Sequence, residues 1–316
     1  MKNSEKDFKF LSCLCSSNSN LKKEGDFLRC TNTECLHSLK DNYFRIIDGV
    51  PILISDLITD TVCSSKTVKS YVQRNDNGLK RTLVNLFGDT PKITRSNCAK
   101  FINLVKKDTV SPKILIIGSG EKGSGTEELY SSEDLSLMGT DIYISNNVDY
   151  VSDAHYLPFK NNSFDGVWIQ AVLEHVVDPH KVVDEIHRIL NKDGLVYAET
   201  PFMQQVHEGP YDFTRFTVLG HRFLFKSFSN ISLGGNQGTG TVLSWSIRYF
   251  FWGIFRSKKI SLLLSLPFSL LIMLFDKFSD KRSLYDGSSG VFFLGRKSDK
   301  TILQKDLIEL YEGFQK

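Results

Sequence analysis

The sequence has little net charge and no secretory signal at its start. Its 316 residues carry a formal net charge of +3, which is too small to indicate a nucleic-acid partner. Residues 1–10 are charged and polar, so they lack the apolar core of a secretory signal. We therefore expect a cytoplasmic protein that does not bind nucleic acid.

The sequence also lacks an apolar run long enough to cross a membrane. Residues 260–275 are free of charge, but this run is about sixteen residues long and Pro267 interrupts it. A membrane-spanning helix needs about twenty apolar residues, and proline disrupts the hydrogen bonding of a helix. We therefore do not expect this stretch to span a bilayer.

Cysteine is scarce and unevenly placed. In a cytoplasmic chain, the six cysteines are expected to be thiols or metal ligands rather than disulfides. Four of them lie within the first forty residues: Cys13, Cys15, Cys30 and Cys35. The segment around them has no apolar core of its own, and a zinc ion held by four thiolates would supply the missing folding energy. Cys63 and Cys98 stand alone, and we expect them to be packing residues.

The centre of the chain contains an aliphatic run that ends in glycines. Residues 114–117 are typical of a strand buried on both faces. Glycines follow closely, and Gly118, Gly120 and Gly123 satisfy the nucleotide-binding pattern G-x-G-x-x-G. Such a turn lets the backbone approach a ligand where a side chain would clash. Asp141 lies about twenty residues further on, where a Rossmann-like sheet places a carboxylate for ribose hydroxyls.

Strand and helix patterns alternate through the rest of the central region. Further strands are expected at residues 137–142, 148–151, 163–170 and 195–201. Asp178 followed by Pro179 is a strong helix start, and apolar residues on one face carry this helix to Leu190. The alternation predicts an α/β fold in which helices cover both faces of a parallel sheet.

Short sequence blocks follow these strands in a consistent order between residues 113 and 228. They are Asp153-Ala154 with Leu157-Pro158-Phe159, Phe164-Asp165, Leu173-Glu174-His175, the run from Glu185 to Leu190, and Asp193-Gly194. Together they resemble the class I S-adenosylmethionine-dependent methyltransferases of the type 11-like group. The resemblance implies a Rossmann-like, seven-stranded methyltransferase sheet and S-adenosyl-L-methionine as the cofactor.

The resemblance also implies which residues bind each part of the cofactor. In the family, the glycine turn holds the methionine part, the acid after the second strand holds the ribose, and the Asp-Ala pair lies beside the adenine. The residues expected to bind the cofactor are Gly118, Ser119, Gly120, Asp141, Asp153, Ala154 and Gln170. The family usually has an acid two residues before the first glycine, whereas this chain has Ile116. A nicotinamide dehydrogenase shares the glycine spacing, but no dehydrogenase catalytic set is visible.

The end of the N-terminal segment provides a second resemblance. Residues 43–54 contain two strand-like runs around a turn at Asp48-Gly49. With the cysteines before it, this ending resembles the zinc-ribbon module at the N-terminus of many bacterial methyltransferases. The family has two residues between the cysteines of each pair, whereas this chain has one and four. Two alternatives stay open: a ribbon that binds zinc, or one that has kept the fold while its ligands drifted.

A polar and aromatic segment, residues 203–217, follows the fifth expected strand. We call it the acceptor loop, because the carboxyl end of a parallel sheet is where a second substrate binds. Its His-x-x-Pro-Tyr-Asp block is similar to blocks in bacterial methyltransferases of surface-polysaccharide and other glycan pathways, which implies O-methylation of a glycan or lipid-linked sugar. We expect His207 to be the base, with Asp212 and Arg215 orienting a small-molecule or glycan acceptor. The alternative is a structural Asp212–Arg215 ion pair beside a His207 that only lines the site, and His175 is a weaker candidate.

The expected organisation has six parts. They are a zinc-ribbon-like module (1–55), a helical linker or lid (56–110), the methyltransferase core (111–240), an apolar helical insertion (241–285), a final core strand (286–298) and a C-terminal helix (299–316). The final strand is expected to pair antiparallel at the sheet edge.

Basic residues flank the apolar insertion, which suits contact with the inner face of a membrane, a cap over the acceptor site or a homodimer interface. For the whole chain, the second hypothesis is a catalytically silent S-adenosylmethionine-fold protein that acts as a binding or scaffold component.

Overall fold

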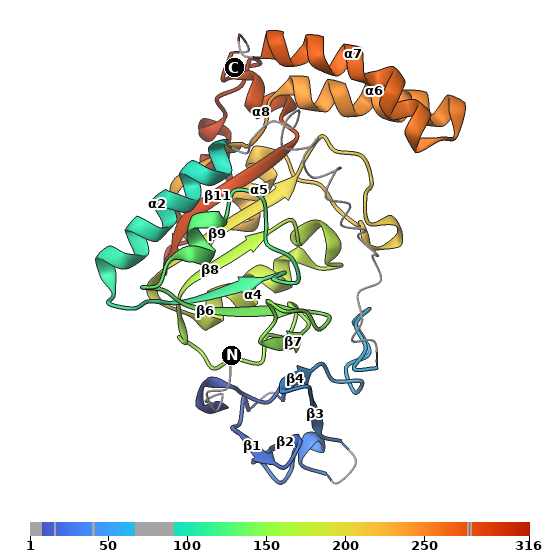
Figure 1. The fold of residues 1–316 in the computed structure, drawn as a ribbon. Coiled ribbons are helices and arrows are strands. Elements are labelled where there is room, and N and C mark those ends of the chain that lie inside the picture. The colour runs from blue at the N-terminus through green and yellow to red at the C-terminus, as the bar shows by residue number, and fades with distance from the viewer. Residues whose placement is uncertain (1–7, 16, 40–41, 67–91, 277, 279) are drawn as a thin grey trace.

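A mixed sheet runs through the molecule with helices on both sides (Figure 1). The computed structural model describes residues 8–15, 17–39, 42–66, 92–276, 278 and 280–316. Within these residues the sheet has eleven strands, in the order β1-β2-β3-β4-β7-β6-β5-β8-β9-β11-β10. The strands are β1 (Leu21–Glu24), β2 (Phe27–Cys30), β3 (Phe44–Ile47), β4 (Val50–Leu53), β5 (Lys113–Ile117), β6 (Ser136–Asp141), β7 (Tyr150–Ser152), β8 (Phe164–Gln170), β9 (Leu190–Pro201), β10 (Phe228–Gly235) and β11 (Gly290–Lys297).

The helices are distributed along the whole described chain. The α-helices are α2 (Lys92–Asp108), α3 (Glu127–Ser131), α4 (Pro179–Ile189), α5 (Val218–Leu224), α6 (Thr239–Phe255), α7 (Lys258–Asp276), α8 (Ser283–Gly287) and α9 (Gln304–Leu307). The shorter 3-10 turns are η1 (Phe8–Phe10), η2 (Leu36–Ser38), η3 (Leu173–His175), η4 (Gly209–Tyr211) and η5 (Ile308–Leu310). The predicted C-terminal helix therefore consists of the short elements α9 and η5.

Strand β5 lies at the centre of the sheet and divides the core into two layers. Leu115 and Ile117 pack in one buried cluster with α4, whereas Ile114 and Ile116 pack in a second cluster with α2. Successive residues of a strand point to opposite faces, so an unbroken aliphatic run requires cover on both. β5 pairs in parallel with β6 and β8. The predicted α/β fold with helices on both faces is confirmed.

The end of the sheet differs from the expectation for the final strand. β11 is antiparallel to its neighbours, as expected, but it lies between β9 and β10 rather than at the edge. The edge prediction was wrong because β10 is a full strand, which pairs with the outer side of β11 over nearly its whole length.

The N-terminal module continues the same sheet. β4 pairs in parallel with β7, with Ile52 opposite Val151. All four residues of β4 are buried, and β1, β2 and β3 follow it in antiparallel pairs. The sheet therefore has eleven strands rather than seven, because the apolar run of β4 pairs with the outer side of β7. The expected seven-stranded core remains within it, as β7-β6-β5-β8-β9-β11-β10.

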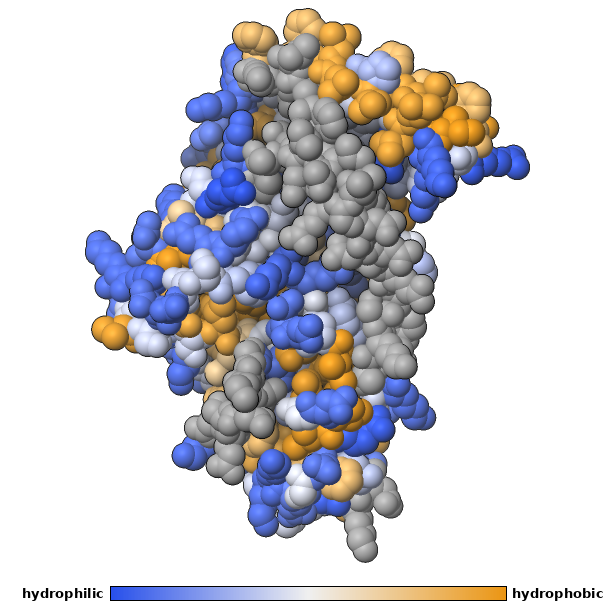
Figure 2. All heavy atoms as spheres, viewed as in Figure 1, coloured by the Kyte–Doolittle hydropathy of each residue, from blue (hydrophilic) through white to orange (hydrophobic). Residues whose placement is uncertain are grey.

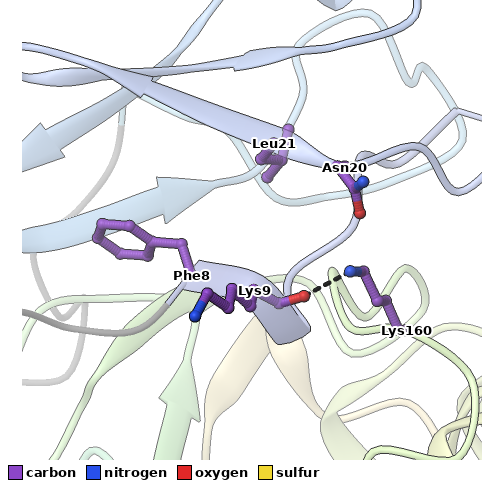
Figure 3. Close-up of a pocket in the computed structure, with 5 residues that line it drawn as sticks. All are labelled: Phe8, Lys9, Asn20, Leu21 and Lys160. Carbon is purple, nitrogen blue, oxygen red and sulfur yellow. Dashed lines mark hydrogen bonds between the residues drawn. The ribbon is translucent and has the colours of Figure 1, made fainter.

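A cavity of about 310 Å³ lies at the junction between the N-terminal module and the core (Figure 3). Its lining residues are Phe8, Lys9, Asn20, Leu21 and Lys160. The ammonium of Lys160 donates to the carbonyl of Lys9 across the junction. Lys160 precedes the amino end of β8, whereas ligands of such folds bind at the carboxyl ends of the strands. We therefore assign this cavity to the junction and not to the active site.

The segment predicted to be a helical linker or lid is described in part. Residues 67–91, on which part of this prediction falls, lie outside the described residues. Residues 55–66 form a loop that follows β4. α2 packs against the core sheet, where the ring of Phe101 meets Trp168 edge to face at a centroid distance of 5.5 Å.

The predicted apolar insertion forms two helices, α6 and α7, between β10 and β11. They pack on one another and project from one end of the molecule (Figure 1). We call residues 239–276 the apolar hairpin, because hydrophobic side chains gather over it (Figure 2). Phe250 and Leu263 are exposed by 65% and 70%. Among the described residues, none of the helices combines the length and hydropathy required of a membrane span.

Candidate active site

The glycine turn after β5 is fixed by hydrogen bonds to β6. The N–H groups of Gly118 and Ser119 donate to the carbonyl of Thr140 at 2.9 and 3.1 Å. Gly118 has a φ of +78°, and a Cβ on it would lie 2.2 Å from Cγ2 of Val172. Both the conformation and the space therefore require glycine. The Ser119 hydroxyl is fully buried, and a Cβ on Gly139 would lie 2.5 Å from it, so the side chain of Ser119 packs against β6.

Asp141 ends β6 beside this turn. Its Oδ2 accepts a hydrogen bond from the N–H of Gly120 at 2.8 Å, and its Oδ1 accepts one from the N–H of Ile142 at 2.7 Å. A Cβ on Gly120 would lie 2.1 Å from the hydroxyl of Tyr143 and 2.8 Å from Asp141 Oδ2. The structure thus forms a cradle that any side chain at residue 120 would fill. A carboxylate beside side-chain-free backbone fits the ribose and methionine parts of S-adenosyl-L-methionine.

Gln170 closes the far side of the glycine turn from the end of β8. Its Nε2 donates to the carbonyl of Ser124 at 3.2 Å, and its Oε1 accepts from the indole N–H of Trp168 at 3.3 Å. A Cβ on Gly123 would lie 2.3 Å from Gln170 Oε1. Gln170 therefore positions the turn through its amide group.

Asp153 follows β7 and is buried together with Ala154. Its Oδ1 accepts hydrogen bonds from the backbone N–H and from Nδ1 of His155, at 2.9 and 2.6 Å, and its Oδ2 accepts one from Thr61. Burial acts to raise the pKa of Asp153, but these hydrogen bonds outweigh it and the pKa is lowered. Thr61 lies in the loop after β4, so the N-terminal part of the chain reaches the expected adenine site. Nothing local in the sequence indicated this contact.

The acceptor loop brings His207, Asp212 and Arg215 together. Nδ1 of His207 lies 3.3 Å from Asp212 Oδ2, and the backbone N–H of His207 donates to the same oxygen at 3.0 Å. Arg215 binds Asp212 through two guanidinium nitrogens. The hydrogen bonds from Arg215 lower the pKa of Asp212. Burial lowers the pKa of His207, and so does the electrostatic effect of the neighbouring His175. The expected base is therefore a neutral imidazole that an ionised carboxylate orients.

Glu174 is a site residue that the sequence interpretation quoted but gave no role. It lies in η3, directly after β8, and is fully buried. Its Oε1 lies 3.6 Å from His175 Nε2 and 3.7 Å from His207 Nε2, yet no other described residue donates a hydrogen bond to either carboxylate oxygen. Burial raises the pKa of the Glu174 carboxyl to about 8. The signal for this residue was the Leu-Glu-His block at the carboxyl end of a core strand.

The four N-terminal cysteines gather in one cluster, as their crowding in the sequence predicts. Sγ of Cys13 lies 3.8 Å from Sγ of Cys35, and Sγ of Cys15 lies 3.9 Å from Sγ of Cys30. All four sulfurs lie within 4.8 Å of one another. Sulfurs about 2.3 Å from a tetrahedral zinc ion would be about 3.8 Å apart. The cluster therefore fits zinc despite its unusual spacing in the sequence.

Comparisons with known proteins agree with this geometry. Residues 116–198 match the family described as "Methyltransferase domain". A ubiquinone/menaquinone biosynthesis C-methyltransferase, UbiE, from Pseudoalteromonas translucida (strain TAC 125) is 33% identical over 141 residues, which are 43% of this chain and 50% of the relative. The chain thus spans half the length of this relative.

Solved structures with a similar fold include two methyltransferases. A SAM-dependent methyltransferase from Archaeoglobus fulgidus has a TM-score of 0.42 and 16% identity, and the match covers 69% of this chain and 99% of that chain. Phosphoethanolamine N-methyltransferase 2 from Haemonchus contortus, in complex with S-adenosyl-L-methionine, has a TM-score of 0.40 and 16% identity, with 65% and 53% covered.

The family match covers the structural parts on which the sequence interpretation rested. Residues 116–198 extend from β5 through the glycine turn, Asp141, Asp153 and η3 into β9. The family that they match is a methyltransferase domain, whereas a dehydrogenase was the competing use of the glycine spacing. Residues 116–198 of this chain therefore match a methyltransferase domain, and the region is similar to a class I S-adenosylmethionine-dependent methyltransferase.

Proposed function

We propose that the protein transfers a methyl group from S-adenosyl-L-methionine to a hydroxyl oxygen of a glycan or lipid-linked sugar. The contact between the acceptor loop and the apolar hairpin is the observation that carries this proposal. Tyr249 of α6 donates to the carbonyl of Val206, next to His207, at 3.1 Å. Gln205 donates to the hydroxyl of Ser246 at 3.2 Å. A candidate base and a surface suited to lipid therefore lie side by side.

Different residues of the chain would bind the cofactor and accept the proton of the acceptor in such a transfer. The glycine turn and Asp141 would hold the cofactor, which supplies a methyl group on a positively charged sulfur when it is bound. The acceptor oxygen would form the new C–O bond with a lone pair while the sulfur–carbon bond breaks, and its proton would pass to Nε2 of His207. Asp212 keeps Nδ1 of His207 protonated, and Arg215 keeps Asp212 ionised.

Replacing Asp141 by alanine is expected to weaken cofactor binding by about 10- to 100-fold. A hydrogen bond to a charged group contributes about 1.5–3 kcal/mol, and about 1.4 kcal/mol corresponds to a factor of ten. Calorimetric titration with S-adenosyl-L-methionine measures the change. Asp134→Ala is the matched control, because that carboxylate is exposed and pairs only at the surface with Lys106. An unchanged affinity in Asp141→Ala would remove this residue from the cofactor site.

We further propose that the apolar hairpin docks on a membrane surface that carries the acceptor. Its apolar side chains are exposed, and Arg256, Lys258 and Lys259 lie at its turn, where they can approach anionic lipid. A homodimer interface and a cap over the site remain as the other ways to cover this surface.

Replacing Phe250 and Leu263 together by glutamate is expected to lower the vesicle-bound fraction at least tenfold. Burying each apolar side chain contributes about 1.5–3 kcal/mol, which the charge would abolish. Co-sedimentation with anionic vesicles at low salt measures the loss. Ile308→Glu is the control, because Ile308 is exposed by 76% outside the hairpin. If the wild type does not bind vesicles, the membrane proposal fails, and light scattering then tests the dimer.

A quinone head group is a second candidate acceptor. The UbiE relative is named as a C-methyltransferase of ubiquinone/menaquinone biosynthesis, and the apolar hairpin suits any lipid-borne acceptor. Incubation of the protein with labelled cofactor and a cell lipid extract distinguishes the candidates. An O-methylated sugar supports the first proposal, and a C-methylated ring supports the second. Cofactor binding without any labelled product supports a catalytically silent scaffold.

We also propose that zinc occupies the cysteine cluster as a structural ion. Burial raises the pKa of Cys13 and Cys30, whereas hydrogen bonds from Ser17 and Ser19 outweigh burial at Cys15 and lower its pKa to about 6. Four thiolates packed this closely need a cation, since their charges would otherwise repel one another. The N–H of His37 also donates to Sγ of Cys35, which supports the thiolate.

A further inference from the structure

Three donor atoms converge beside the acceptor loop, in a group separate from the cysteine cluster. They are Oε1 of Glu174, Nε2 of His175 and Nε2 of His207, and such atoms from these residues lie within 4.8 Å of one another. Two of the residues come from η3 at the carboxyl end of β8, and the third comes from the loop after β9. Two segments that are about thirty residues apart in the sequence thus bring one carboxylate and two imidazoles close together.

Glu174 lacks, among the described residues, the hydrogen-bond donors that a buried carboxylate normally has. Glu199, a carboxylate at the same end of the sheet, accepts hydrogen bonds from Tyr197, Thr94 and Asn236 at 2.7–2.8 Å. Glu174 is completely buried, and no other described residue donates a hydrogen bond to either of its oxygens, although the charge of Arg215 acts on it through space. A buried carboxylate without donors is costly unless a cation compensates it. The fold therefore supplies hydrogen-bond donors to Glu199, whereas Glu174 faces the two imidazoles.

The other ring nitrogen of each imidazole faces an acceptor: a hydrogen-bonded carbonyl for His175 and a carboxylate at ion-pair distance for His207. Nδ1 of His175 donates to the carbonyl of Tyr211 at 2.7 Å, which leaves Nε2 free to act as a ligand. Nδ1 of His207 lies 3.3 Å from the carboxylate of Asp212, with the same effect on its Nε2. Histidines that bind metal ions usually donate their second N–H to a carboxylate or backbone carbonyl in this way. The tautomer of both rings thus presents lone pairs toward Glu174.

We propose that Glu174, His175 and His207 bind a divalent first-row transition-metal ion. Two imidazoles and one carboxylate suit Mn²⁺, Fe²⁺ or Zn²⁺ better than Ca²⁺. The side chain of His207 is 29% exposed, so the ion would keep positions open toward the acceptor loop. Three protein ligands with open positions are characteristic of a catalytic rather than a structural metal site.

This site deepens the proposed function and rests on it for the role of the ion. An acceptor hydroxyl bound to the ion would have a lower pKa and would lose its proton to water before attack. His207 would then act as a ligand rather than as the base. The open positions favour an acceptor with two neighbouring oxygen atoms, such as a vicinal diol, because both can bind one ion.

Manganese binding tests the site without any need for turnover. Titration of the whole protein with Mn²⁺, followed by the loss of the free-ion electron paramagnetic resonance signal, counts bound ions and gives their Kd. Mn²⁺ is a suitable probe because it prefers carboxylate and imidazole ligands to a four-thiolate cluster. We expect one bound ion, with Kd at least tenfold weaker in Glu174→Gln and His207→Ala. His180→Ala is the control, because His180 is exposed on α4 outside this cluster.

A thermal-shift measurement provides the second readout. Mn²⁺ is expected to raise the Tm of the wild type but not that of Glu174→Gln, which keeps the shape of the side chain while removing its charge. If the Glu174→Gln protein does not fold, Asp212→Asn replaces it, with a loss in affinity of about 10- to 100-fold expected for a residue that orients a ligand.

The site is overturned if the wild type binds no Mn²⁺, or if both Glu174→Gln and His207→Ala bind it as the wild type does. Loss of turnover in His207→Ala without metal binding would instead retain the methyl transfer and assign His207 as the base. Metal binding without methyl transfer to any acceptor would contradict the proposed function and keep the site.

Discussion

Replacing His207 by alanine is expected to lower kcat: by about 10²- to 10⁴-fold, the range for loss of a general base, where it accepts the proton itself, and through loss of the bound ion where it is a metal ligand. Its side chain is the most exposed of the three that meet at Glu174, and Asp212 lies beside the other ring nitrogen. The effect arises at the acceptor and not at the cofactor. We therefore expect the affinity for S-adenosyl-L-methionine to stay within about twofold of the wild type. Calorimetry measures this affinity, and transfer of a labelled methyl group measures turnover.

Two control variants separate this role from a general effect on folding. His180→Ala removes an exposed imidazole elsewhere and should leave turnover unchanged. Asp212→Asn keeps the size of the side chain that positions His207 but removes its charge, so a partial loss of kcat is expected. Near-normal turnover in His207→Ala would exclude this histidine from the reaction and leave it as a residue that lines the site.

Replacing Cys30 by serine is expected to release one zinc ion and to unfold β1 to β3. Structural zinc sites bind with an apparent free energy of about 10–16 kcal/mol, far more than strands of four residues gain by pairing. Metal analysis of the native protein measures the zinc, and hydrogen exchange over residues 21–47 measures the unfolding. The core should remain folded, because its two buried clusters consist mainly of residues outside β1 to β3.

Cys98→Ala is the control for this zinc prediction. Cys98 is buried in α2 against the core and lies outside the cysteine cluster, so its removal should leave the zinc content unchanged. Freshly purified wild-type protein without zinc would contradict the proposal. The cluster would then be a ribbon that folds without a metal ion.

The order of the core could be predicted from the sequence because its signals are local. The aliphatic residues before Gly118 require cover on both faces, and the spacing to Asp141 follows from one strand–helix–strand unit. Asp178 with Pro179 marks the start of α4, where the Asp178 side chain accepts a hydrogen bond from the N–H of Lys181. Each of these features depends on a few neighbouring residues, so it can be recognised without the fold.

The remaining features depend on contacts between distant segments. Thr61 meets Asp153 only because β4 pairs with β7, and no pattern near either residue indicates this. The lack of hydrogen-bond donors at Glu174 among the described residues likewise depends on the tertiary structure. The sequence shows only a glutamate after a strand and does not reveal whether its side chain will be buried or hydrogen-bonded. The acceptor loop, folded back over η3, places this buried carboxyl beside two imidazoles.

The pairing of β4 with β7 also affects how the protein behaves in solution. Without β4, the backbone amide and carbonyl groups on the outer side of β7 would be unpaired, and such an edge can recruit strands from other molecules. In the intact chain the exposed end is instead β1, a strand of four residues of which three are charged and exposed. Two adjacent lysines on a short edge strand discourage intermolecular strand pairing. The N-terminal module thus replaces the open edge of β7 with a short charged one, which is expected to lower the tendency to aggregate.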